Sequence, residues 1–120
     1  MRHIRSEEIK FSKTPGGEGI SLLVGRHPKH GHSQTHTIAL VQLEVGQSSE
    51  SHFHKEREES YFFLSGYGEA IVSGQTLEIK AGDLIHTMPG ERHQFINIGK
   101  EVLRYLIVTA PPWVPEDSWE

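Results

Sequence analysis

The chain has 120 residues, enough for one compact domain with a single hydrophobic core, and it contains no cysteine, which excludes disulfides, thiolate metal sites and cysteine nucleophiles. A formal net charge of −4, with acidic and basic residues interspersed, leaves no basic stripe of the kind that binds nucleic acid. Nine histidines in so short a chain are unusual, and because imidazole is the commonest metal ligand, they suggest a metal bound through nitrogen and oxygen.

The N-terminal residues MRHIRSEEIKF lack the apolar core of a signal peptide, and no segment approaches the roughly 20 apolar residues that a membrane helix needs. We therefore expect a cytoplasmic protein without a membrane partner. Residues 1–34 are expected to add one or more strands and a histidine-rich loop to the main domain.

The stretch GRHPKHGHSQTH, at residues 25–36, predicts this loop, because its histidines alternate with turn-forming residues. The histidines are His27, His30, His32 and His36. They could form a second metal site or a flap over a pocket, but solvated loop residues are the interpretation that we favour.

Short β-strands are predicted along most of the remaining chain. Residues 35–45, THTIALVQLEV, are rich in β-branched residues, alternate in places and end at Gly46. Similar segments, closed by glycine or a polar turn, follow at residues 60–66, 68–74, 76–82, 93–99 and 102–110. No long segment repeats apolar residues at helical spacing. Many short strands separated by glycines predict an antiparallel sandwich or barrel, of which the jelly roll is one form.

Residues 110–120, APPWVPEDSWE, are predicted to form a C-terminal arm. The three prolines cannot donate to a β-ladder, so the arm should lie extended over the surface. Trp113 and Trp119 are candidates to anchor it.

The segment SHFHKEREESYFF carries the most specific chemical pattern. His52 and His54 are one residue apart, which on a strand places both imidazoles on one face, about 6.6 Å apart along the strand axis. Glu59 follows after the charged turn KERE, and His93 comes later, from ERHQF. Three imidazoles and one carboxylate suit divalent iron, manganese, nickel, cobalt, copper or zinc. Each feature alone has a plainer interpretation, namely a hydrogen-bonded histidine pair and a solvated charge run.

Together these spacings resemble the cupin superfamily from Thr35 to Thr109. The first cupin motif, G-x5-H-x-H-x4-E-x6-G, is filled at every fixed position, by Gly46, His52, His54, Glu59 and Gly66. The second, G-D-x4-P-x-G-x2-H-x3-N, is filled by Gly82, Asp83, Gly90, His93 and Asn97. Met88 stands in its usual proline position, and Pro89 follows.

The resemblance implies an all-β, single-domain jelly-roll barrel, the double-stranded β-helix, with residues 35–109 as its core. It also implies that one divalent transition metal lies inside the barrel, held by His52, His54, Glu59 and His93. Cupin barrels commonly pair, so a homodimer is expected, and the sequence before residue 35 and after residue 109 could supply an exchanged strand.

Strand parity extends the site by one layer. If the strands are regular, Glu59 shares a face with Tyr61 and Phe63, and His93 shares one with Phe95 and Asn97. We therefore expect the pocket to be lined by Tyr61, Phe63, Phe95 and Asn97. Packing in the barrel is the alternative for both phenylalanines, and hydrogen bonding to turn backbone is the alternative for Asn97.

Two residues are candidates for a catalytic role. Tyr61 is one, because a buried phenol hydroxyl normally needs a polar partner, which the metal site would supply. Simple packing in the barrel is the alternative for Tyr61. His86 is the other, as a general acid or base, although its strand is too irregular for the sequence to settle which face it occupies.

These features suggest a metal-dependent enzyme acting on a small oxygenated molecule, such as a sugar derivative or an organic acid, by isomerase, lyase or dioxygenase chemistry. One carboxylate ligand leaves a divalent ion net positive, and an octahedral ion keeps positions open for such a guest. A non-catalytic module that binds a small ligand through the metal, and a purely structural metal site, are the alternatives.

Overall fold

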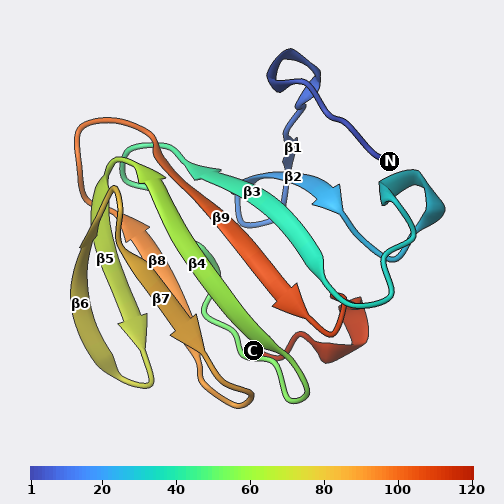
Figure 1. The fold of residues 1–120 in the computed structure, drawn as a ribbon. Coiled ribbons are helices and arrows are strands. Elements are labelled where there is room, and N and C mark those ends of the chain that lie inside the picture. The colour runs from blue at the N-terminus through green and yellow to red at the C-terminus, as the bar shows by residue number, and fades with distance from the viewer.

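The computed structural model describes residues 1–120 and contains two antiparallel β-sheets that face each other (Figure 1). The larger sheet contains, in spatial order, β1 (Ser12–Lys13), β2 (Gly19–Val24), β3 (Thr37–Leu43), β9 (Leu103–Ala110), β4 (Glu58–Ser65) and β7 (Leu84–Thr87). The smaller sheet contains β6 (Gln75–Lys80), β5 (Tyr67–Val72) and β8 (His93–Asn97). The helices are single 3-10 turns, η1 (Ser6–Glu8), η2 (Pro28–His30) and η3 (Pro115–Asp117), and none is long or apolar enough to cross a membrane.

The path of the chain between the sheets confirms the predicted jelly roll. From β4 in the larger sheet the chain passes to β5 and β6, returns to β7, crosses to β8 and returns again to β9. Along the edge of β8 that does not pair with β5, the segment before β4 forms isolated bridges, from Ser48 to Ile96 and from His52 to His93, rather than a continuous strand. The two sheets therefore do not close into one continuous ladder.

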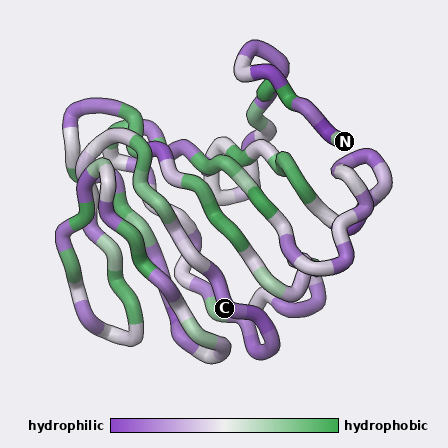
Figure 2. Tube along the Cα trace, viewed as in Figure 1, coloured by the Kyte–Doolittle hydropathy of each residue, from purple (hydrophilic) through white to green (hydrophobic).

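The strands predicted from the sequence correspond to β3, β4, β5, β6, β8 and β9. These strands form because buried and exposed side chains alternate along them. On β4, Tyr61 and Phe63 are buried, whereas Phe62 and Leu64 face outward. Figure 2 shows hydrophobic residues along the strands of both sheets and hydrophilic residues at the turns and the N-terminus. Each sheet thus has one apolar face that is buried against the other sheet.

The core lies between the sheets and consists of Val41, Leu43, Tyr61, Phe63, Ala70, Ile79, Phe95, Leu103 and Tyr105. Its aromatic rings pack edge to face, with centroids 5.5 Å apart for Phe63 and Phe95 and 4.8 Å apart for Tyr61 and Phe95. Removing one such ring costs about 3–5 kcal/mol of stability. The core ends at Tyr61, whose hydroxyl points to the polar end of the interior.

Strand register determines which polar residues meet at that end. In the β4–β9 pair Glu59 is opposite Thr109, and in the β3–β9 pair Thr109 is opposite Thr37. All three are at most 5% exposed. The larger sheet therefore contributes a row of buried oxygen-bearing side chains opposite the start of β8.

Candidate metal centre

His52, His54, Glu59 and His93 come together at this polar end of the barrel interior. Each offers one ligand atom, and these atoms all lie within 4.8 Å of one another. His93 begins β8, Glu59 lies near the start of β4, and the other two histidines precede β4. The four residues thus form a group that could hold a metal ion.

The segment that carries His52 and His54 is not the regular strand that the sequence analysis assumed. It is held by isolated bridges, from His52 to His93 on one side and from Phe53 to Trp119 on the other. The Gly90 N–H also donates to the carbonyl of His54 at 2.6 Å. The two imidazoles nevertheless lie side by side, with ring centroids 5.1 Å apart.

Backbone carbonyls orient all three imidazoles. The Nδ1 atoms of His52, His54 and His93 lie 2.9, 2.7 and 3.1 Å from the carbonyl oxygens of Glu50, Asp117 and Glu91, respectively. Because a carbonyl can only accept, each Nδ1 carries a proton, and a neutral ring then presents an unprotonated Nε2. The three rings are therefore set to offer Nε2 lone pairs to a common centre.

The Nε2 atoms and the Glu59 carboxylate around that centre are all hydrogen-bond acceptors, and too few N–H or O–H groups lie nearby to satisfy them. The Nε2 atoms of His52 and His93 lie 3.2 Å apart. His54 Nε2 lies 3.1 Å from Glu59 Oε1 without the geometry of a hydrogen bond, and it is a buried nitrogen with no hydrogen-bond partner. Such an unpaired buried atom costs about 1–3 kcal/mol. A shared cation removes this cost, so the residues fit a divalent transition metal.

Two hydroxyl groups hold the Glu59 carboxylate. Tyr61 donates to Oε1, and Thr109 donates to Oε2 at 2.6 Å. Burial alone would raise the pKa of Glu59, but its contacts with His54 and His93 outweigh burial and hold that pKa well below its usual value. Burial, reinforced by the Glu59 charge, raises the pKa of Tyr61 well above its usual value. At neutral pH Glu59 is therefore ionised and Tyr61 keeps the proton that it donates.

The imidazoles differ in their electrostatic surroundings. Burial lowers the pKa of His52, and the neighbouring His93 lowers it further, which favours the neutral ring that a metal requires. Burial also opposes protonation of His54, but Glu59 outweighs it and raises the pKa of His54. Glu59 thus favours the charged form of His54, whereas burial and His93 favour the neutral form of His52.

The four residues open into a cavity of about 1060 Å³ between the sheets. Near the cluster its walls are apolar or aromatic and include Val41, Tyr61, Phe95, Tyr105 and Ile107. The outer walls come from the N-terminal segment, which contributes Glu18 and His30, and from the C-terminal segment, which contributes Trp113 and Trp119. A ligand at the cluster would therefore be surrounded largely by carbon, with polar groups nearer the mouth.

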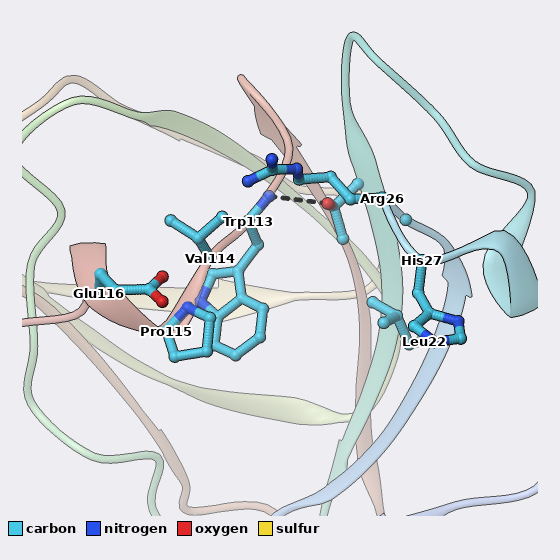
Figure 3. Close-up of a pocket in the computed structure, with 9 residues that line it drawn as sticks. Leu22, Arg26, His27, Trp113, Val114, Pro115 and Glu116 are labelled. Carbon is cyan, nitrogen blue, oxygen red and sulfur yellow. Dashed lines mark hydrogen bonds between the residues drawn. The ribbon is translucent and has the colours of Figure 1, made fainter.

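A smaller cleft of about 440 Å³ lies beside this cavity, between the end of β2 and the C-terminal segment (Figure 3). Figure 3 shows Arg26 and His27 on one side and Trp113, Pro115 and Glu116 on the other. The Trp113 N–H donates to Thr37 Oγ1 at 2.8 Å, the contact drawn there as a dashed line. This bond ties the C-terminal segment to the first residue of β3.

A family model described as a cupin domain matches residues 39–109. The chain belongs to the cupin family. This cupin is 33% identical over 109 residues to an oxalate-binding protein of Thermotoga maritima, covering 88% of this chain and 90% of that protein. It is 29% identical over 118 residues to an uncharacterized protein of Methanocaldococcus jannaschii, covering 98% and 94%. A solved structure, described as a predicted oxalate decarboxylase of Thermotoga maritima, matches with a TM-score of 0.80 at 29% identity, covering 91% and 98%.

The departure of this cupin from the second motif lies in a turn. Met88 is exposed, the Glu91 N–H donates to its carbonyl, and the Glu91 carboxylate accepts from its N–H at 2.9 Å. Gly90 has a φ of +89°, a left-handed conformation that favours glycine. The turn thus closes with methionine in the proline position, and His93 still reaches the cluster.

Of the four residues expected to line the pocket, Tyr61 and Phe95 border the cavity, whereas Phe63 and Asn97 lie away from it. Phe63 is fully buried in the core. The Asn97 amide donates to the carbonyls of Leu43 and Glu101, so it joins the ends of strands. Phe63 therefore packs in the barrel, and Asn97 hydrogen-bonds to backbone groups, as the alternative interpretations of these two residues expected.

His86, the second catalytic candidate, lies on the outer face of the larger sheet rather than in the cavity. Its side chain is 43% exposed, and Nε2 contacts Glu58 Oε1 at 2.9 Å. Alternate residues of a strand face opposite sides, and on β7 the buried position belongs to Thr87, opposite Glu59. His86 therefore does not reach a ligand at the metal cluster.

The histidine-rich loop does not form a second group of potential ligands, since the cluster at His52 is the one group of three or more in the chain. His27 Nδ1 accepts from the Lys29 N–H, and His36 pairs with the Thr35 hydroxyl. His32 is exposed. His30 borders the cavity, so the loop contributes to its wall.

Sequence reasoning missed three buried residues around the cluster, namely Arg57, Thr109 and Asp117. Arg57 lies in the charge run KEREE, yet it is 8% exposed and pairs with Asp117 at 2.9 Å. Thr109 and Asp117 carry no motif, and they reach the site from 50 and 63 residues beyond their partners Glu59 and His54. Only strand register and the path of the C-terminal segment reveal them.

Proposed function

We propose that this cupin binds one divalent transition metal through His52, His54, Glu59 and His93 and is a metal-dependent enzyme acting on a small oxygen-rich molecule. The observation that carries the proposal is the common orientation of the three imidazoles. Each has its Nδ1 proton engaged by a carbonyl and its Nε2 turned to Glu59 and the other rings. Such an arrangement stabilises an ion better than an empty centre.

The charge of the site supports an organic acid as the substrate class. One carboxylate leaves a divalent ion net positive, so an anionic chelating group is a favourable guest. The relative from Thermotoga maritima is named as an oxalate-binding protein, and we extend that ligand class to this chain. Sugar derivatives are the second class to be tested.

In this proposal the bound ion supplies Lewis-acid chemistry and, if redox-active, reaction with dioxygen. Tyr61 and Thr109 keep the Glu59 carboxylate in place through their hydroxyls. Val41, Phe95 and Ile107 exclude water from the cavity around the substrate. The residues of the chain therefore orient the centre and set the polarity around it.

The test is removal and restoration of individual metals while organic acids, oxalate first, and sugar derivatives are screened for turnover. We expect activity to disappear in the metal-free protein and in His54→Ala, and to return when metal is restored to the unmodified chain. His86→Ala is the matched control, because it removes a histidine from outside the cavity. Turnover that is indifferent to metal, or unchanged in His54→Ala, would rule out a metal-dependent enzyme.

A non-catalytic ligand-binding module is the second candidate function, and the name of the oxalate-binding relative favours it. The Tyr61 proton is also engaged by Glu59, which leaves the cluster without a free acid beside it. Calorimetric titration of the metal-loaded protein with oxalate separates the candidates. Oxalate that binds and is recovered unchanged indicates a binding module, whereas its consumption indicates an enzyme. A structural metal would raise thermal stability without binding any of the ligands.

We further propose that the protein forms a homodimer through the outer face of the larger sheet. That face exposes Phe62, Leu64, Leu84 and Val108, which are 37–61% exposed. Phe62 is opposite Leu84 in the β4–β7 pair, so these two side chains are neighbours on that face. A second copy of the same face would cover them, because an isologous interface pairs a surface patch with itself.

A further inference from the structure

The C-terminal segment Pro112–Trp119 folds back over the loop that carries His54, and it is fastened at both ends. At its start, the Trp113 N–H donates to Thr37 Oγ1 at 2.8 Å (Figure 3). At its end, Phe53 and Trp119 exchange two backbone hydrogen bonds of 2.9 and 3.0 Å. The residues between these points are therefore held against the segment that provides two of the four metal ligands.

Asp117 makes most of the contacts between this C-terminal segment and the ligand loop. Its carbonyl oxygen lies 2.7 Å from His54 Nδ1. Its carboxylate accepts from the backbone N–H groups of Lys55 and Glu56 at 2.9 and 3.1 Å, and from Arg57 Nη1 at 2.9 Å. One residue thus binds four consecutive residues, beginning with a metal ligand.

Arg57 closes the arrangement from the other side. Its Nε donates to the carbonyl of Pro112 at 2.9 Å while its Nη1 binds Asp117. Arg57 and Asp117 are 8% and 6% exposed. A buried guanidinium needs its partners. Arg57 therefore ties the C-terminal segment to the turn between His54 and Glu59 at two points, through a hydrogen bond to Pro112 and an ion pair with Asp117.

Among the three imidazoles, His54 is the one whose Nδ1 partner lies in a distant part of the chain. The carbonyls that accept from His52 and His93 belong to Glu50 and Glu91, each two residues before its histidine. The carbonyl that accepts from His54 lies 63 residues away. Local backbone geometry therefore orients two of the rings, whereas the third ring relies on Asp117.

We propose that residues Pro112–Trp119 form a strap that positions His54 for metal binding, with Asp117 as the positioning residue. The inference rests on the proposed function, since it presumes that the cluster takes a metal. Without the Asp117 carboxylate, its carbonyl is no longer held opposite His54 Nδ1, and the ring loses both its tautomer and its direction. Partners of this kind typically contribute 10–100-fold to metal affinity.

The experiment compares full-length Asp117→Ala with the unmodified protein, using cobalt(II) in competition with a chromophoric chelator. We expect Asp117→Ala to bind about 10–100-fold more weakly and Asp117→Asn, which keeps one acceptor oxygen, to lie in between. Glu116→Ala is the matched control, because it removes an exposed carboxylate from the same turn and should leave affinity unchanged.

A second readout separates positioning from general destabilisation. Electron paramagnetic resonance of the copper(II)-loaded proteins reports the coordinating nitrogens, which should fall from three to two in Asp117→Ala while circular dichroism shows the barrel intact. Unchanged affinity with three nitrogens in Asp117→Ala would overturn the strap. If Asp117→Ala does not fold, Asp117→Asn is judged by the same two measurements. Failure of the unmodified protein to bind either metal would instead contradict the proposed function.

Discussion

At the scale of single residues, two hydroxyl donors support the candidate metal centre beside its four potential ligands. Both carboxylate oxygens of Glu59 accept a hydrogen bond. Oε1 accepts from Tyr61, on the same strand β4, and Oε2 accepts from Thr109, on the neighbouring strand β9. Tyr61 also lies 2.9 Å from His93 Nε2. Its hydroxyl therefore contacts two ligands at once, and its ring forms part of the core.

Tyr61→Phe tests this contact, because it removes the hydroxyl and keeps the ring. We expect cobalt(II) affinity to fall about 10-fold, the lower end of the range for groups that orient ligands. The thermal midpoint should change little in comparison. Tyr67→Phe is the control, since Tyr67 is an exposed tyrosine on β5. Equal affinities for the two variants would show that the Tyr61 hydroxyl does not support the centre.

Glu18 is half-buried in the cavity wall, and we expect it to make a pH-dependent contribution to the free energy of unfolding. Burial raises the pKa of its carboxyl, the Glu50 N–H opposes that shift and the Glu50 charge adds to it. Glu18 also acts on Tyr105. Burial raises the pKa of Tyr105 well above its usual value, so this tyrosine keeps its proton. With the folded pKa above the unfolded one, stability is fully present below the unfolded pKa and is lost as pH rises through the folded pKa.

Glu18→Gln removes this titration while keeping the shape of the side chain. We expect the variant to gain free energy of unfolding relative to the unmodified protein as pH rises above 4.5, the ordinary pKa of a glutamate, as urea denaturation would measure. Glu44→Gln, at an exposed position, serves as the control. A difference between Glu18→Gln and the unmodified protein that stays constant over this range would contradict the assignment.

At the scale of elements, spacing and alternation made the strands and the grouping of the four candidate ligands predictable, whereas long-range contacts could not be predicted. The motif positions of His52, His54, Glu59 and His93 lie within short segments, and β-branched alternation marks the strands. The facing of His86 could not be predicted, because β7 has only four residues and their sequence, LIHT, does not alternate between apolar and polar residues. The partners Thr109 and Asp117 depend on strand register and on a folded-back segment, which no local pattern specifies.

The turn between β4 and β5 gives a prediction about a motif glycine. Gly66 has a φ of +93°, and a Cβ there would lie 2.7 Å from the Val102 carbonyl oxygen and 2.8 Å from Leu103 Cα. Gly74 has a φ of +79° but no atom within 4 Å of such a Cβ. Both alanine variants meet left-handed strain of about 1–2 kcal/mol, and Gly66→Ala adds a backbone clash. Urea denaturation should therefore show Gly66→Ala as clearly the less stable, and equal losses would contradict the structure around Gly66.

At the scale of the whole molecule, the two faces of the larger sheet have different roles. The inner face closes the core and the metal cluster, while the outer face carries the apolar patch of Phe62, Leu64, Leu84 and Val108. Multi-angle light scattering should give the mass of two chains for the unmodified protein. Leu84→Lys, which places a charge in the patch, should shift the mass toward one chain, whereas Met88→Lys, in the turn after β7, should not. A single-chain mass for the unmodified protein would contradict the proposed dimer.

In the proposed metal centre, one metal ion lies among His52, His54, Glu59 and His93. Anomalous diffraction from crystals of the metal-loaded protein, recorded on both sides of the absorption edge of the ion, tests it most directly. We expect one strong peak at about 2.0–2.2 Å from the three Nε2 atoms and a Glu59 oxygen. No peak at this position, or a peak only at the histidine-rich loop of residues 25–36, would contradict it.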